Sequence, residues 1–154
     1  MAANTTRMRV PDFDPAAVAR AEAALEALGA AFPDWMQEET ARLEEALGVA
    51  RGGAFAPDSL ASLQARAHDV KGMATTYKYP LATRLADCLC RLLATPERRS
   101  LASANRKLLE AAVAAIRACV RENVRDEANP MGATLVRELD ARVAEALEGT
   151  AAPD

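Results

Sequence analysis

The sequence predicts an all-α protein, a four-helix up-down bundle with additional helices at its N- and C-terminal ends. Hydrophobic residues make up 51% of the 154-residue chain, but aromatic residues make up only 4%. The apolar content is mostly Ala and Leu, which favour packed helices over sheets. Apolar residues also recur at steps of three and four, in segments separated by Pro or Gly. We expect one domain over 13–148, between flexible tails at 1–12 and 149–154.

The first predicted helix begins at Asp14 and Pro15, an acidic N-cap followed by proline at the first helical position. Its apolar stripe consists of Val18, Ala21, Leu25, Leu28 and Phe32, and it resumes with Met36, Leu43 and Leu47. Pro33 interrupts the pattern, so the segment is either two helices or one long helix kinked at this proline. The run Arg51-Gly52-Gly53 is a stop signal.

Four further helices are predicted, each with a proline near its start. Their approximate ranges are 57–77, 81–93, 98–124 and 131–147, and the prolines are Pro57, Pro80, Pro96 and Pro130. The side chains expected to face inward are Leu60, Leu63, Ala67, Val70, Ala74 and Tyr77; Leu81, Leu85, Cys88, Leu89 and Leu92; Leu101, Leu108, Ala112, Ile116, Cys119 and Val120; and Leu135, Leu139, Val143 and Leu147. The sequence therefore predicts five or six amphipathic helices joined by short loops.

Charge and composition disfavour several classes of function. The net charge is −3, and nucleic-acid binding needs a basic face, so we expect no nucleic-acid partner. There is neither an apolar leader nor an unbroken run of 18 apolar residues, so we expect no membrane span and a cytoplasmic location. The three cysteines fit no zinc motif and are expected to be reduced thiols packed in or near helices. One histidine supplies too few ligands for a metal site.

His68 is the only histidine, and helical geometry places it on the solvent side of the predicted 57–77 helix. Each residue advances by about 100°, which puts His68 about 130° from the direction of the apolar stripe. Its neighbours at helical spacing are Gln64, Ala65, Lys71, Gly72 and Thr75. Lys71 would bring a positive charge within reach of an anion on the imidazole, and Gln64 and Thr75 can donate hydrogen bonds.

Gly72 stands in the interior of this predicted helix, where glycine costs about 1 kcal/mol relative to alanine. No turn requires it there, and the cost is explained if another molecule must approach His68 closely. An exposed neutral imidazole has a free lone pair and suits nucleophilic attack on phosphorus. The adjacent Asp69 lies about 100° further round the helix, so no fixed His–carboxylate dyad is expected. A partner would have to supply the remaining catalytic groups.

The stretch Ala67-His68-Asp69-Val70-Lys71-Gly72-Met73-Ala74 resembles the signature of histidine phosphotransfer (HPt) domains, in which lysine and glycine follow the phospho-accepting histidine by three and four residues. The run Tyr77-Lys78-Tyr79-Pro80-Leu81-Ala82-Thr83-Arg84-Leu85 is similar to the aromatic-Gly-aromatic-Pro-Leu continuation found in a bacterial branch of single-domain HPt proteins. The motifs cover about 67–85, and the helical layout covers about 25–147. The sequence departs from the pattern at Lys78, where the family usually has glycine. We expect this lysine to alter the turn or to add charge near the docking face.

The resemblance implies a monomeric phosphocarrier that shuttles a phosphoryl group between receiver-domain aspartates, and not an enzyme in its own right. It implies that His68 is the phospho-acceptor, that Lys71 screens the phosphate charge and that Gly72 leaves room for the receiver's active-site loop. The receiver supplies Mg²⁺ and an acidic pocket, so no cofactor is expected on this chain. The expected docking residues on the same helix are Ala61, Ala65, Met73 and Thr75.

Two other kinds of function are open to a chain of this composition. A helical docking module could bind a receiver or a sensor kinase without phosphotransfer, and it would then keep its function when His68 is replaced by alanine. A small hydrolytic enzyme is disfavoured, because a single histidine leaves no readable Ser/His/Asp set, carboxylate pair or metal cluster.

Overall fold

The computed structural model describes residues 14–148, and all the regular elements in that range are helical. In chain order they are α1 (Pro15–Gly52), the 3₁₀-helix η1 (Pro57–Leu60), α2 (Ala61–Thr76), α3 (Pro80–Leu92), α4 (Pro96–Ala104), α5 (Arg106–Arg121) and α6 (Pro130–Leu147). The all-α class is confirmed, while the up-down order of four helices stays a prediction. The predicted tails at 1–12 and 149–154 lie outside the described residues.

The chain divides into two compact units between Ala31 and Phe32, which are described separately. Within the first unit, the described residues form the beginning of α1. The Asp14 carboxylate accepts a hydrogen bond from the Ala16 backbone nitrogen at 3.2 Å, as expected for an N-cap. The apolar stripe here is exposed at Val18, Leu25 and Leu28. Periodicity therefore predicted the helix correctly, but it did not identify a buried face in this unit.

Within the second unit, α1 continues through Pro33 and is buried from Met36 onward. The segment is thus one helix, which decides between the two alternatives for Pro33. The rings of Phe32 and Trp35, on either side of this proline, pack against Tyr77 with centroid distances of 5.2 and 5.4 Å. Such aromatic contacts offset the cost of proline in a helix interior.

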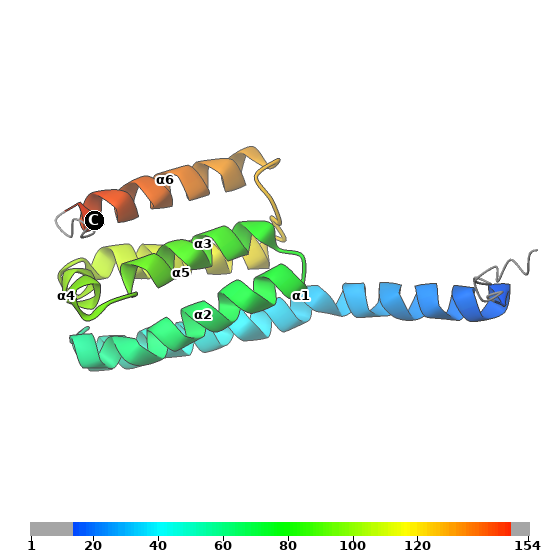
Figure 1. The fold of residues 1–154 in the computed structure, drawn as a ribbon, viewed down its shortest axis with the longest axis horizontal. Helices are drawn as coiled ribbons and strands as arrows, with labels where there is room; N and C mark the ends of the chain where they lie inside the picture. The colour runs from blue at the N-terminus through cyan, green and yellow to red at the C-terminus, as the bar shows by residue number, and fades with distance from the viewer. Residues whose placement is uncertain (1–13, 149–154) are drawn as a thin grey trace, which may run out of the picture. The chain divides into compact units, whose positions relative to one another are not determined.

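Helix α3 is the central helix of the second unit, since it packs against α2, α5 and α6 (Figure 1). The five residues predicted to face inward from this helix are all buried, namely Leu81, Leu85, Cys88, Leu89 and Leu92. Full burial of each leucine stabilises the fold by about 1.5–3 kcal/mol. In the described part of the chain, no helix combines the length and apolar character needed to cross a membrane.

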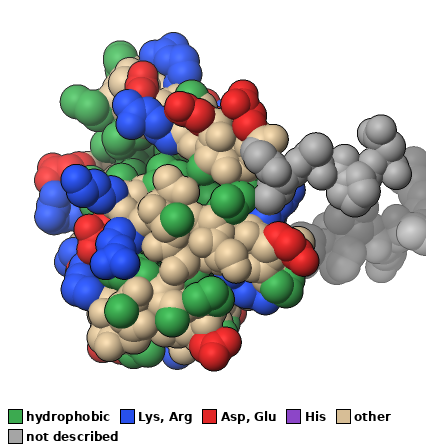
Figure 2. Space-filling view, turned by 90° about the vertical axis from the view of Figure 1, so that its left-hand side faces the viewer, with side chains coloured by type: hydrophobic (Ala, Val, Ile, Leu, Met, Phe, Trp, Pro, Cys, Tyr) green, Lys and Arg blue, Asp and Glu red, His purple; other side chains and the backbone are tan. Residues whose placement is uncertain are grey.

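The long helix predicted over 98–124 is wrong, because α4 and α5 are separate helices that meet at Asn105. The Asn105 side chain donates a hydrogen bond from Nδ2 to the Leu101 carbonyl at 2.8 Å, and the Asn105 backbone nitrogen donates to Ala102. Asparagine competes for backbone groups in this way and thereby favours helix ends. Figure 2 shows the end of the molecule that carries α4, where basic and acidic side chains are interspersed.

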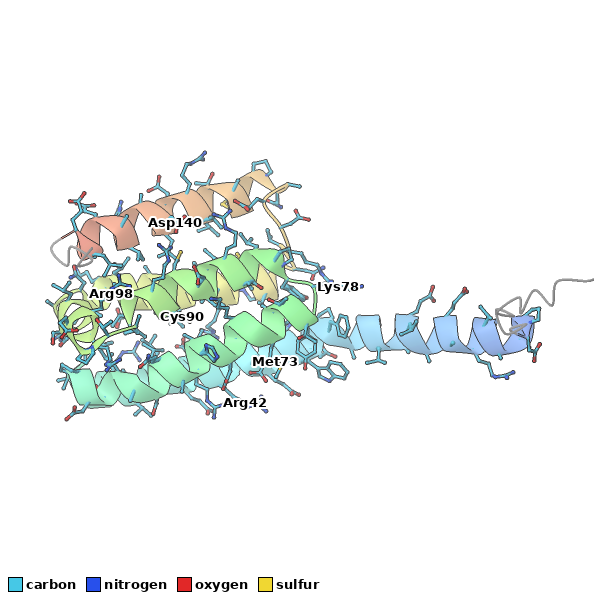
Figure 3. All side chains as sticks on the ribbon, in the orientation of Figure 1. Arg42, Met73, Lys78, Cys90, Arg98 and Asp140 are labelled. Carbon is cyan, nitrogen blue, oxygen red and sulfur yellow. The ribbon has the colours of Figure 1, made fainter. Side chains whose placement is uncertain are left out.

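The turn from α2 into α3 has the backbone that the HPt pattern satisfies with glycine. Lys78 has a φ of 63°, in the left-handed region. The Tyr79 nitrogen donates to the Ala74 carbonyl at 2.8 Å and the Lys78 nitrogen donates to Thr75 at 3.3 Å, which together form a Schellman motif. Figure 3 shows Lys78 at this turn. The lysine therefore has not changed the turn type, and it occupies a conformation that L side chains rarely adopt.

Replacing Lys78 with glycine should stabilise the protein by about 0.5–1 kcal/mol, because glycine adopts a positive φ without steric cost. The free energy of unfolding in urea measures the effect. Lys78→Ala is the matched control, since it removes the same side chain but retains Cβ, and its stability should stay near that of the wild type. Equal stabilisation by both substitutions would show that the lysine side chain, and not its backbone conformation, is unfavourable.

Candidate functional site

Helix α2 places His68 on its exposed face. The apolar residues that alternate with it around the helix are fully buried, namely Leu63, Ala67, Val70 and Ala74. The His68 side chain is exposed. The predicted orientation of the imidazole is therefore confirmed, and it follows directly from the helical period of the buried stripe.

A shallow hollow of about 450 Å³ adjoins His68. It is lined by Ala61, Gln64, Ala65, His68, Asp69, Cys90 and Ala94. Two of the predicted docking residues, Ala61 and Ala65, belong to this lining, and small side chains there leave the imidazole accessible. Cys90 lies on α3, on the side of that helix toward α2 (Figure 3). Sequence reasoning missed Cys90 and Ala94 because no local spacing connects them to His68.

The surface at Gly72, one turn beyond His68, is open. A Cβ atom built at Gly72 would meet no atom within 4 Å outside its own helix turn, so no neighbouring helix requires a glycine there. This confirms that Gly72 faces solvent. Met73 is 40% exposed and Thr75 is exposed, so both are accessible, and the docking role of all these residues stays a prediction.

Lys71 has a partner that the sequence did not reveal. Its Nζ donates to Asp87 Oδ1 at 2.8 Å, and this hydrogen bond is the main reason that the pKa of Lys71 is raised. Asp87 lies on α3, and its other carboxylate oxygen is 3.3 Å from Arg91 Nε. Lys71 was expected to be available to an anion on His68. In the structure such an anion would have to compete with Asp87 for the ammonium group.

Replacing Asp87 with asparagine should lengthen the lifetime of a phosphoryl group on His68 by about 2- to 5-fold, because Lys71 would then be free to approach it. The lifetime is measured as the loss of radiolabel from the isolated phosphoprotein. Lys71→Ala should shorten it, and in that background Asp87→Asn should have no further effect. A lengthening that persists without Lys71 would refute this competition.

Gln64 and Thr75 also have partners within the chain. Gln64 is half-buried, and its Oε1 accepts a hydrogen bond from Arg99 of α4 at 2.9 Å. The Thr75 hydroxyl donates to the Lys71 carbonyl at 3.1 Å and lies 3.2 Å from the hydroxyl of Thr83. Thr75 is therefore engaged at the α2–α3 contact, while Gln64 lies in the hollow with His68.

A charge network next to the hollow joins α3 to α6. Arg91 and Arg84 both pair with Asp140, which lies on the α6 face toward α3 (Figure 3). The Cys88 thiol donates to Asp140 at 3.1 Å, and this bond is the main reason that the pKa of Asp140 is lowered. Burial raises the pKa of Cys88 to about 11, so Cys88 remains a thiol donor at neutral pH.

The three cysteines are free thiols, as predicted. Cys88 and Cys119 are buried, and Cys90 is half-buried. Burial raises the pKa of Cys90 as well, while the nearby Lys71 charge lowers it. Among residues 14–148, no three His, Cys, Asp or Glu side chains lie together in a way that could hold a metal ion.

A larger hollow of about 800 Å³ lies between α5 and α6, and it contains none of the predicted site residues. Its apolar lining includes Leu108, Ala115, Leu135 and Leu139. Because no nucleophile lies in this lining, we place the candidate site at His68 and not in the larger hollow. Comparison of the chain with protein-family models, with curated proteins and with solved structures finds no match.

Proposed function

We propose that this chain is a histidine phosphotransfer protein, in which His68 accepts a phosphoryl group from a receiver-domain aspartate and passes it to another. The observation that carries the proposal is the exposed imidazole of His68 between the open surface at Gly72 and a hollow bordered by small side chains. The motif residues Lys71 and Gly72 support the same function through their resemblance to HPt domains.

The chemistry requires one nucleophile from this chain and an acyl phosphate from the partner. The unprotonated ring nitrogen of His68 attacks phosphorus, a nitrogen–phosphorus bond forms, and the bond between phosphorus and the aspartate oxygen breaks. The aspartate leaves as a carboxylate, and the other ring nitrogen keeps its proton. The return step to a second receiver reverses this exchange, so a carrier needs neither ATP nor an activated water.

The surroundings of His68 suit transfer better than hydrolysis. Asp69, the adjacent carboxylate, is 3.5 Å from Arg66 in an i,i+3 ion pair. A carboxylate held by an arginine is a poor general base for water. The receiver would then supply Mg²⁺ and the acidic pocket, and the contact would be small and transient.

The test is incubation of the wild-type protein with a phosphorylated receiver domain and Mg²⁺, followed by mapping of the transferred phosphate. We expect an acid-labile, alkali-stable phosphate on the peptide that contains His68. Label on a serine, threonine or aspartate would overturn the proposal. Binding of the receiver with no transferred label would instead identify the chain as a docking module.

A further inference from the structure

Arg99 connects the candidate site to a helix that the HPt motif does not include. This residue of α4 donates from Nη1 to Gln64 Oε1 and to the Leu93 carbonyl, both at 2.9 Å. Gln64 lies one turn before His68 on α2, and both residues line the same hollow. Arg99 therefore fixes a side chain that is a direct neighbour of the proposed phospho-acceptor.

The chemistry of the pair determines which end of the Gln64 amide faces Arg99. A guanidinium group has only donors, so the amide must present its oxygen to Arg99. The amide NH₂ group is then on the opposite side, as the donor end of the same planar group. Without Arg99, the amide could rotate and present either end to an approaching anion.

We propose that Arg99 is a positioning residue, which orients Gln64 so that the amide NH₂ group donates to a phosphoryl oxygen on His68. This inference rests on the proposed phosphotransfer function. It assigns to α4 a part in the site that neither the His68 motif nor the local helix spacing contains. A hydrogen bond to a charged acceptor is stronger than one to a neutral acceptor, so a preset donor favours the phosphorylated state.

The chain offers a matched control in Arg98. Its Nη1 donates to the Arg91 carbonyl at 3.0 Å, so Arg98 and Arg99 both bind carbonyl groups near the C-terminal end of α3, but only Arg99 contacts Gln64. Arg99→Ala should slow transfer from a phosphorylated receiver to His68 by about 5- to 10-fold. Arg98→Ala should change the rate by less than about 2-fold while perturbing the same end of the helix.

A double-mutant cycle separates positioning from a structural effect. Gln64→Ala should slow transfer as much as Arg99→Ala does, and the double variant should be no slower than either one. Arg99→Lys keeps the positive charge and the fold but lacks the fork that reaches two acceptors, so it should give an intermediate rate. This variant carries the test if Arg99→Ala does not fold.

A second readout uses the unphosphorylated protein. The side-chain amide signals of Gln64 in a ¹H–¹⁵N NMR spectrum should shift in Arg99→Ala but stay unchanged in Arg98→Ala. If wild-type protein accepts no phosphate, the proposed function fails, and these signals still test the Arg99–Gln64 contact. If wild-type protein accepts phosphate but the Arg99 variants transfer at the wild-type rate, or Arg99→Ala slows the Gln64→Ala protein further, this inference is wrong.

Discussion

Replacing His68 with glutamine should abolish phosphoryl acceptance and leave the fold intact. Glutamine has a similar size and favours helices, but its amide nitrogen has no lone pair available for attack on phosphorus. Loss of the nucleophile should reduce labelling by a phosphorylated receiver on the order of 10³-fold or more. Because the side chain is exposed, the free energy of unfolding should change by less than about 0.5 kcal/mol.

The control for this substitution is Asp69→Asn, which changes the adjacent exposed residue and should retain most of the transfer activity. Equal labelling of the wild type and His68→Gln would show that His68 is not the acceptor. A His68→Ala protein that keeps full function in cells would favour a docking module that acts without phosphotransfer.

Gly72→Leu should block transfer by about 100-fold or more while making the protein more stable. The surface there is open, so the leucine side chain would project into the space that an approaching receiver must occupy. Helix propensity should raise the free energy of unfolding by about 0.5–1 kcal/mol, since leucine replaces glycine in a helix interior. Opposite changes in activity and stability would separate a functional glycine from a packing glycine.

Two alanine substitutions calibrate this result. Gly72→Ala should give a similar gain in stability with a smaller loss of transfer, because only one methyl group is added. Gly132→Ala should be destabilising by about 1–3 kcal/mol, since its Cβ would lie 2.8 Å from the Asp126 carbonyl and 2.9 Å from Leu81 Cδ2. Normal transfer by Gly72→Leu would refute our explanation of this glycine.

The sequence predicted the face of α2 correctly because a helical period is a local property. The buried positions of that helix and the exposure of His68 follow from 3.6 residues per turn alone. The division at Asn105 was missed, since neither Pro nor Gly marks it and a single side-chain contact with Leu101 decides it. The outcome at Pro33 depended on packing against Tyr77, which is distant in the chain.

The partners of the candidate site residues could not be predicted for the same reason. Asp87 reaches Lys71 from α3, and Arg99 reaches Gln64 from α4. Neither pair has a regular spacing that a sequence pattern could reveal, because both depend on how separate helices pack. The motif therefore identified candidate functional residues, while the groups that restrain them became evident only in three dimensions.

The unequal burial of the thiols gives this protein a built-in attachment point for a fluorescent reporter. Cys88 and Cys119 are buried, and burial raises the pKa of each to about 11, so a maleimide dye at neutral pH should react with them slowly. Cys90 is half-buried and borders the same hollow as His68. A dye attached there would sense any molecule that covers the imidazole, so association could be followed by fluorescence without radiolabel and without introducing a cysteine.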